Sequence, residues 1–198
     1  VTVNDDAFYF TVTDADDDGV ISLWSSEGDA TNTSELIAHL PGTVQSQVVL
    51  EDTTYFIAGP TNTRILWKLT DDGVEIVTFL PRAASLLTVA GGQLAFTART
   101  EGVYGVGPSL WVSDGTADGT RMVIDLTPVQ PGNISHIAHT DNGIVFIVRN
   151  DDAIVEGVVD YSLWISNGYR DGTYQLISSN AGSWGFGTVA QAPELIRV

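Results

Sequence analysis

Short runs of apolar and β-branched residues alternate with polar residues along this chain, and turn-forming residues separate the runs. In the clearest stretch, four runs follow one another at 43–50, 53–58, 64–70 and 74–80. The residues between them, among them Gly59-Pro60 and Asp71-Asp72-Gly73, are typical of turns. No stretch has the 3.6-residue period of an amphipathic helix. The pattern therefore predicts an all-β protein.

The four-run pattern recurs along the chain. Two further sets of expected strands lie at 84–90, 93–100, 109–113 and 120–126, and at 133–140, 143–149, 161–166 and 173–178. Each third run carries a Leu-Trp pair, and each second run carries a phenylalanine: Leu23-Trp24, Leu66-Trp67, Leu110-Trp111 and Leu163-Trp164, with Phe10, Phe56, Phe96 and Phe146. The tryptophans are 43, 44 and 53 residues apart, which is close to the length of a propeller blade.

This repeat predicts a β-propeller or propeller-like fold of about four blades, each with four antiparallel strands. Residues 1–198 form one domain in this reading, with repeats at about 1–42, 43–82, 83–132 and 133–182. The N-terminal unit is predicted to lack a first strand, because its first run, 6–13, corresponds to a second strand elsewhere. Residues 183–190 read as a lone first strand that would complete the N-terminal blade and close a ring. The alternative is that the chain is part of a larger propeller.

The third copy carries the clearest motif. Residues 109–120 read Ser-Leu-Trp-Val-Ser-Asp-Gly-Thr-Ala-Asp-Gly-Thr, and a weaker form recurs from Leu163 to Thr173. This resembles a repeat of large bacterial surface proteins, Glu-Leu-Trp-x-x-Asp-Gly-Thr followed by a second Gly-Thr. The resemblance implies a propeller-like fold and a surface location, and it implies no particular activity. Asp114-Gly115 and Asn167-Gly168 are predicted to form tight hairpin turns, and each Leu-Trp pair to place one side chain on each face of its strand.

The net charge and the absence of cysteine exclude several classes of function and structure. The chain has 25 acidic and eight basic residues, a net charge of −17, and no cysteine. Such a surface repels nucleic acid, and no apolar run is long enough for a membrane helix. A disulfide framework and thiolate zinc sites are excluded. We expect an extracellular or cell-surface location within a larger multidomain chain, where calcium takes the place of disulfides.

The residues from Asp14 to Ser22 carry the best local signal for chemistry. Asp14, Asp16 and Asp18 offer carboxylates at alternate positions before a glycine, Val20 offers a backbone carbonyl, and Ser22 a hydroxyl. This spacing resembles a calcium loop. The position of the bidentate glutamate of an EF-hand is occupied by a serine, so the expected dissociation constant is weak, on the order of 10⁻⁴ M. The alternative is a solvated acidic hairpin tip.

The connections between second and third strands are the other candidate binding region. They differ most in length between copies, and long loops on rigid sheets often carry binding residues. The candidate ligand-binding residues are Arg99, Tyr104, Arg149 and Tyr161. His136 and His139 are three apart on an expected strand, so they should point to opposite faces and not share a metal. No catalytic residues are predicted.

These observations lead to a functional hypothesis. We expect a non-catalytic binding or structural module of a large secreted or cell-surface protein, such as an adhesin, stabilised by Ca²⁺ and binding a glycan or an extracellular protein. The alternatives are a carbohydrate-active hydrolase or lyase on a propeller scaffold, or a pure spacer. A carboxylate pair with a strongly raised pKa would favour the enzyme.

Overall fold

The computed structural model describes residues 2–4, 7–13, 20–28, 35–60, 62–102, 105–128, 132–155 and 158–178. In these ranges the chain forms four antiparallel sheets of four strands each, and within each sheet the strands lie side by side in sequence order. The first sheet contains β1 (Thr2–Asn4), β2 (Ala7–Thr13), β3 (Val20–Ser26) and β4 (Glu35–Pro41). The second contains β5 (Thr43–Leu50), β6 (Thr53–Gly59), β7 (Arg64–Thr70) and β8 (Gly73–Leu80). The third contains β9 (Ser85–Ala90), β10 (Gln93–Gly102), β11 (Gly105–Ser113) and β12 (Arg121–Asp125). The fourth contains β13 (Asn133–Thr140), β14 (Gly143–Val155), β15 (Val158–Ser166) and β16 (Thr173–Ser178).

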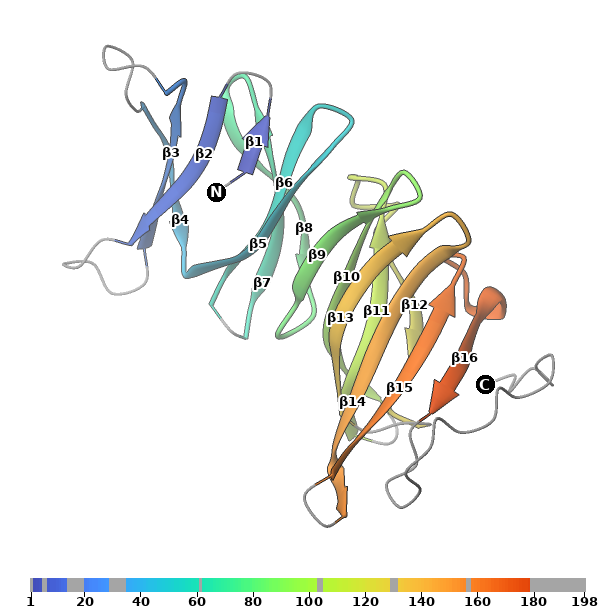
Figure 1. Cartoon of the computed structure of the whole chain (residues 1–198). Helices are drawn as coiled ribbons and strands as arrows, with labels where there is room; N and C mark the ends of the chain where they lie inside the picture. Colours follow the sequence, from blue (N-terminus) through green and yellow to red (C-terminus); the bar gives the residue numbers. More distant parts are fainter. Residues whose placement is uncertain are drawn as a thin grey trace.

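The sheets are arranged as successive blades. The first strands of neighbouring sheets contact one another, β1 with β5, β5 with β9, and β9 with β13. The outer strands fan away from this seam (Figure 1). The all-β, propeller-like prediction with four four-stranded units is therefore confirmed. The first and fourth sheets lie at opposite ends of the row in Figure 1, so the described residues form an open array.

The Leu-Trp pairs of the second and third sheets each contribute to two different packing layers, as the alternation of side chains along a strand requires. Leu66 packs with the third sheet, whereas Trp67 packs with Leu23 and Leu40 of the first sheet. Leu110 packs with the fourth sheet and Trp111 with the second. The expectation of one side chain on each face is confirmed, and the pair joins three successive sheets.

One feature of the Leu-Trp pairs, a β-bulge beside them, could not be read from the sequence. In all four sheets, the pairing of the third strand with the fourth shifts by one residue between the leucine and the tryptophan. The bulge leaves an extra residue on the fourth strand: Ile37, Val77, Val123 and Leu176. Such a bulge bends and twists an outer strand, which makes it a poor template for edge-to-edge pairing.

The phenylalanines of the repeat are the cross-strand partners of the tryptophans. Three of the pairs are stacked, with ring centroids 6.3 Å apart for Phe56 and Trp67, 6.2 Å for Phe96 and Trp111, and 6.1 Å for Phe146 and Trp164. Phe56, Phe96 and Phe146 are almost completely buried. Aromatic pairs of this kind contribute about 0.5–1.5 kcal/mol beyond their area burial, so the repeat stabilises the second, third and fourth sheets.

The structure corrects two expectations about chain organisation. The first sheet has its own first strand, because β1 pairs with β2 from Thr2↔Tyr9 to Asn4↔Ala7. The predicted closing strand, 183–190, lies outside the described residues, so ring closure stays a prediction.

The second correction concerns the connections between second and third strands, which are not the long irregular loops that we expected. β10 and β11 remain paired as far as Gly102↔Gly105, and β14 and β15 pair again at Val155↔Val158.

These extended hairpins look like loops in the sequence because glycine and acidic residues interrupt their alternation. Backbone pairing does not require that alternation, so the strands continue beyond the apolar pattern. Among the described residues, the 3₁₀ turn Arg170–Gly172 is helical, and no helix is long and apolar enough to span a membrane.

Candidate functional site

The Ser-Asp-Gly segment of the third copy is held by a local hydrogen-bond network. The Gly115 N–H donates to Ser113 Oγ (3.1 Å), and Ser113 Oγ lies 2.7 Å from Thr120 Oγ1. The N–H and hydroxyl of Thr116 both donate to Asp114 Oδ1, at 2.9 and 2.7 Å. These bonds account for the motif's serine, aspartate and threonines, which fix the conformation of the loop.

The fourth copy repeats this network with an amide in place of the carboxylate. The Gly168 N–H donates to Ser166 Oγ (3.0 Å), and Ser166 Oγ lies 2.6 Å from Thr173 Oγ1. The Tyr169 N–H donates to Asn167 Oδ1 (3.0 Å). The expectation of tight hairpin turns with positive φ at both residues of each pair is wrong in both copies. Such turns are favoured by positive φ at both central residues, whereas here only the glycine of each pair has it.

The same segments also contact the preceding sheet. Gly115 lies so close to the phenol of Tyr55 in the second sheet that a Cβ would overlap the ring hydroxyl. The Arg121 guanidinium in the third sheet donates to the Gly168 carbonyl (2.8 Å) and lies 4.5 Å from the centre of the Tyr169 ring. The motif loops therefore fix one sheet against the next at the edge where β5 joins β6.

A polar pocket opens beside the Gly115–Tyr55 contact. Its volume is about 560 Å³, and three sheets contribute to it. Its aromatic and charged lining residues are Tyr9 of the first sheet, Asp52, Tyr55, Lys68 and Asp71 of the second, and Asp114 of the third. Thr53, Thr54, Thr70 and Thr116 add hydroxyl groups. The volume lies in the range of small-molecule sites.

The electrostatics of the pocket keep its main groups in defined protonation states. The hydrogen bonds that Asp114 accepts from Thr116 lower the pKa of its carboxyl, so this side chain stays ionised. Burial raises the pKa of Tyr55, with Lys68 opposing and Asp114 adding to the effect, so the phenol stays protonated and can donate. Lys68 Nζ is 2.9 Å from Glu75 Oε2, which partly neutralises the pocket's lysine.

Sequence reasoning missed this pocket. Its residues come from a strand of the first sheet, two strand ends of the second and a turn of the third, more than a hundred positions apart. The structure itself marks the site in the turn between β5 and β6, where Glu51 and Asp52 both have left-handed backbone (φ +48° and +64°). The third sheet uses Gly91 and Gly92 at the matching turn. Left-handed backbone costs non-glycine residues about 1 kcal/mol or more each, and such strain is concentrated at functional sites.

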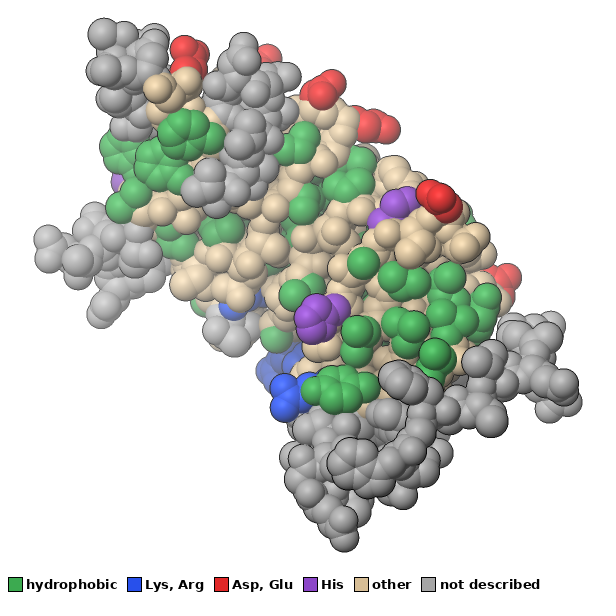
Figure 2. Space-filling model, viewed as in Figure 1, with side chains coloured by type: hydrophobic (Ala, Val, Ile, Leu, Met, Phe, Trp, Pro, Cys, Tyr) green, Lys and Arg blue, Asp and Glu red, His purple; other side chains and the backbone are tan. Residues whose placement is uncertain are grey.

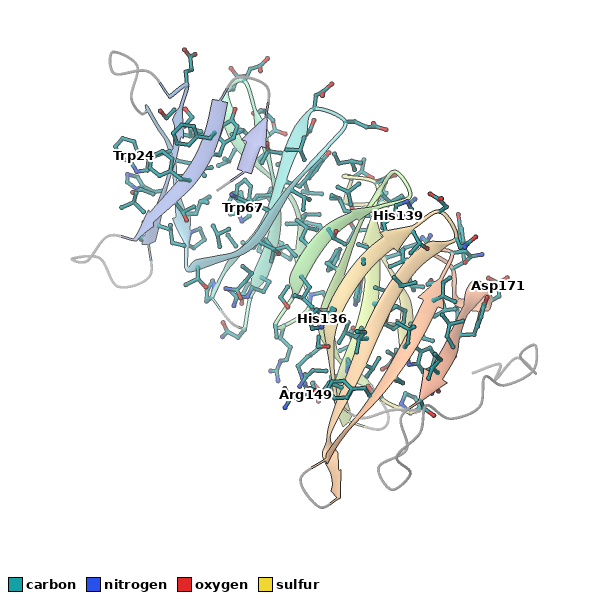
Figure 3. All side chains as sticks on the ribbon, in the orientation of Figure 1. Trp24, Trp67, His136, His139, Arg149 and Asp171 are labelled. Atoms are coloured by element: carbon teal, nitrogen blue, oxygen red, sulfur yellow. The ribbon has the colours of Figure 1, made fainter. Side chains whose placement is uncertain are left out.

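Three of the four predicted ligand-binding residues lie along one edge of the third and fourth sheets. Arg99 Nη1 donates to Asn133 Oδ1 (2.5 Å) and Arg99 Nη2 to the Val106 carbonyl (3.2 Å). Asn133 is the cross-strand partner of Arg149, which is in turn the partner of Tyr161. Arg149 (Figure 3) and Tyr161 are both exposed. Their role in ligand binding stays a prediction, and Tyr104 lies outside the described residues.

The predicted calcium ligands are described only in part. Asp14, Asp16 and Asp18 lie outside the described residues. Val20 begins β3, and Ser22 Oγ lies 3.3 Å from His39 Nδ1 on the next strand. The described residues hold no group of three or more acidic or histidine side chains that could bind a metal. The calcium site therefore stays a prediction.

The histidines of the fourth sheet do not form a pair. His136 is the cross-strand partner of Ile147 in β14, and His139 is the partner of Ile144. Ile144 and Ile147 are three residues apart on one strand, so they lie on opposite faces of the sheet. Both histidines are exposed and well separated in Figure 3, and His136 Nδ1 lies 3.0 Å from Ser135 Oγ. The expectation that they point to opposite faces agrees with this register.

Comparison with known proteins gives little further information. No family model matches the sequence, and no curated protein is significantly similar to it. Among solved structures, the chain is similar to an α-L-arabinofuranosidase from Clostridium thermocellum. The TM-score is 0.45 and the identity 15%, over 87% of this chain and 70% of that chain. Similarity at this level carries no information about activity.

Proposed function

We propose that the chain is a non-catalytic binding module of a secreted or cell-surface protein, and that it binds a neutral glycan in the pocket between the first three sheets. The observation that carries the proposal is the pocket's lining, in which the rings of Tyr9 and Tyr55 lie among carboxylate, ammonium and hydroxyl groups. Sugars present apolar C–H faces and a ring of hydroxyls. Aromatic rings and charged hydrogen-bonding groups match these two features.

The charges of the pocket favour a neutral sugar over an acidic one. Asp52, Asp71 and Asp114 line it, and its lysine is paired with Glu75. An incoming carboxylate or sulfate would face three acidic side chains on a chain of net charge −17. A hydroxyl, by contrast, donates to a carboxylate without a charge penalty.

The protonation state of Asp114 suits sugar binding and excludes this residue as the proton donor of a glycosidase. A glycosidase needs one carboxyl group whose pKa is raised enough to donate a proton. The pKa of Asp114 is shifted in the opposite direction, because its ionised form accepts two hydrogen bonds from Thr116. A carboxylate that stays ionised is suited to hold a sugar hydroxyl. The enzyme and the pure spacer are the two alternatives that the experiment must distinguish.

The test is a glycan array with the full chain, followed by titration calorimetry with the best neutral oligosaccharide. We expect Asp71→Asn to weaken binding about tenfold, in line with the loss of one charge-assisted hydrogen bond. Asp141→Asn is the matched control, because Asp141 is an exposed turn residue of the fourth sheet and does not line the pocket. The protein's melting temperature should be unchanged in both variants.

Three results would contradict the proposal. Absence of binding to any glycan would favour a spacer. Release of reducing ends from a bound oligosaccharide would favour the enzyme. Equal loss of binding in Asp71→Asn and Asp141→Asn would place the ligand elsewhere on the surface.

A further inference from the structure

Three apolar clusters lie between neighbouring sheets. In each cluster, one face of a sheet packs against the opposite face of the next sheet. The face with the Phe-Trp pair packs against the preceding sheet, as Phe96 and Trp111 of the third sheet do against the second. The opposite face, which carries the leucine of the Leu-Trp pair and the bulge residue, packs against the following sheet. We call these the aromatic face and the leucine face.

The leucine faces of the second and third sheets are closed by their neighbours. Ile57 and Leu66 of the second sheet are completely buried, as are Ala95 and Leu110 of the third. The bulge residue of the third sheet, Val123, is also buried. These side chains form continuous apolar clusters with the aromatic face of the next sheet.

The leucine face of the fourth sheet has no such cover among the described residues. Val145, Ile147, Leu163 and Ile165 lie on one face, since Val145 pairs with Ile165 and Ile147 with Leu163. All four are only half-buried, and the bulge residue Leu176 is 37% exposed. Figure 2 shows apolar side chains gathered over this sheet at the end of the row. Contiguous apolar surface of this kind marks an interaction site.

Among the residues that the structure describes, nothing covers the aromatic face of the first sheet at the other end of the row. Phe10 and Trp24 are cross-strand partners there, at the positions of Phe96 and Trp111. Phe8 and Phe10 are 5.8 Å apart on this face, and Val12 beside them is 47% exposed. Phe10 and Trp24 are half-buried, whereas the matching Phe56 and Phe96 are completely covered.

We infer that the leucine face of the fourth sheet docks the aromatic face of the first sheet of a second copy of this chain. The two open faces are the same complementary pair that already forms the internal junctions, so docking repeats an existing interface. The contact is heterologous, because different faces of the two copies meet. It therefore leaves one open face at each end of the pair and can continue into short arrays.

Charge controls when this association occurs. Each copy carries a net charge of −17, so two copies repel each other at low ionic strength. In about 1 M salt the Debye length falls to about 3 Å, and the apolar contact is no longer opposed. Association should therefore strengthen as NaCl is added, which is opposite to the behaviour of a contact based on ion pairs.

The first experiment measures self-association of the full chain by sedimentation velocity, over a wide range of protein and NaCl concentrations. We expect dimers and larger species that increase with both. Leu176→Glu should weaken association tenfold or more, because it places a charge in an apolar contact. Phe79→Glu is the matched control. Phe79 is a 65% exposed residue of β8, outside both open faces, and its substitution should leave association unchanged.

The second experiment tests which faces meet. The chain has no cysteine, so single-cysteine variants can be cross-linked specifically with a flexible bis-maleimide. A mixture of Val12→Cys and Tyr161→Cys chains should give a cross-linked pair, in excess over either variant alone. Both side chains are exposed, so each substitution should be tolerated.

Three outcomes would overturn the inference. The first is a monomer at every protein and salt concentration, which would mean that other residues of the chain cover the face. The second is equal weakening by Leu176→Glu and Phe79→Glu. The third is a chain with both cysteines that cross-links within itself and stays monomeric, because this would mean that the four sheets close into a ring.

Discussion

Gly115 of the third sheet lies directly against the phenol of Tyr55 in the second, and no room remains for a side chain between them. The contact joins two units that the sequence presents as separate repeats. It also forms one wall of the candidate glycan pocket, since both residues line it. The geometry of the pocket therefore depends on how closely the motif loop approaches the preceding sheet.

Substitution of Gly115 by alanine tests this contact. Gly115 has φ +89°, so alanine would be strained in the backbone and would also overlap Tyr55. We expect a loss of about 1–3 kcal/mol in the free energy of unfolding, measured by urea denaturation. Gly92→Ala is the control, because Gly92 has a similar φ of +74° but open space around it. Equal losses in the two variants would mean that backbone strain, and not the contact with Tyr55, determines the effect.

The buried indole N–H groups lead to a second prediction. Trp111 Nε1 donates to Ser109 Oγ (2.9 Å). Trp24 Nε1 is buried and has no hydrogen-bond partner among the described residues, although Ser22 occupies the matching position. Ser109→Ala should therefore cost about 1–3 kcal/mol, because it leaves a buried donor unsatisfied. Ser22→Ala should cost much less. Thermal unfolding of both variants checks the difference, and similar costs would contradict the role of the indole bond.

The lowered pKa of Asp114 predicts a specific pH dependence of stability. A carboxyl group whose pKa is lower in the folded than in the unfolded state stabilises the fold above its unfolded pKa, near 3.8. This stabilisation is lost as the pH falls through the folded pKa. Asp114→Asn removes it, while the amide can still accept from Thr116, as Asn167 accepts from Tyr169 in the fourth sheet.

The measurement is the melting temperature of both proteins between neutral pH and about pH 2. We expect the native protein to be the more stable near neutral pH and the difference to shrink as the pH falls below 4. A difference that stays constant across this range would show that ionisation of Asp114 does not contribute.

Calcium binding by the loop after β2 is tested by thermal stability. With a dissociation constant on the order of 10⁻⁴ M, about 10 mM Ca²⁺ would stabilise the folded state by about 2.7 kcal/mol. The double variant Asp16→Ala, Asp18→Ala should lose this response. NaCl of equal ionic strength is the control for general screening of the net charge of −17. An unmutated protein that responds equally to both salts would contradict a calcium site.

The strand pattern was readable from the sequence because local chemistry determines it. The strands of the second sheet, β5 to β8, begin and end within one residue of the expected runs. Alternating apolar residues, glycine and acidic turns are local signals. The sequence was misleading where backbone pairing continues without an apolar pattern, as at Gly102↔Gly105. It was also misleading at Asp114, whose side chain caps a wider loop.

The candidate site was much less predictable. Arg99 and Tyr161 were selected because they border the connections between second and third strands, and the structure places them on paired strands along one edge. The pocket itself was missed, because no short segment contains more than a fraction of its lining. Neither Tyr9 nor Lys68 has a distinctive sequence context. Their proximity arises only when three sheets are stacked.

The sequence by itself determined the all-β class, the four units and the pairing of each leucine with a tryptophan. These follow from side-chain periodicity and turn chemistry, which act over a few residues. The tertiary structure alone decided which faces of the sheets are covered, where Gly115 meets Tyr55, and why Leu163 is half-exposed while Leu66 is buried. The physical reason is that the burial of a side chain depends on the sheet beside it. The same sequence motif is covered by a neighbouring sheet in the middle of the row and is not covered at its end.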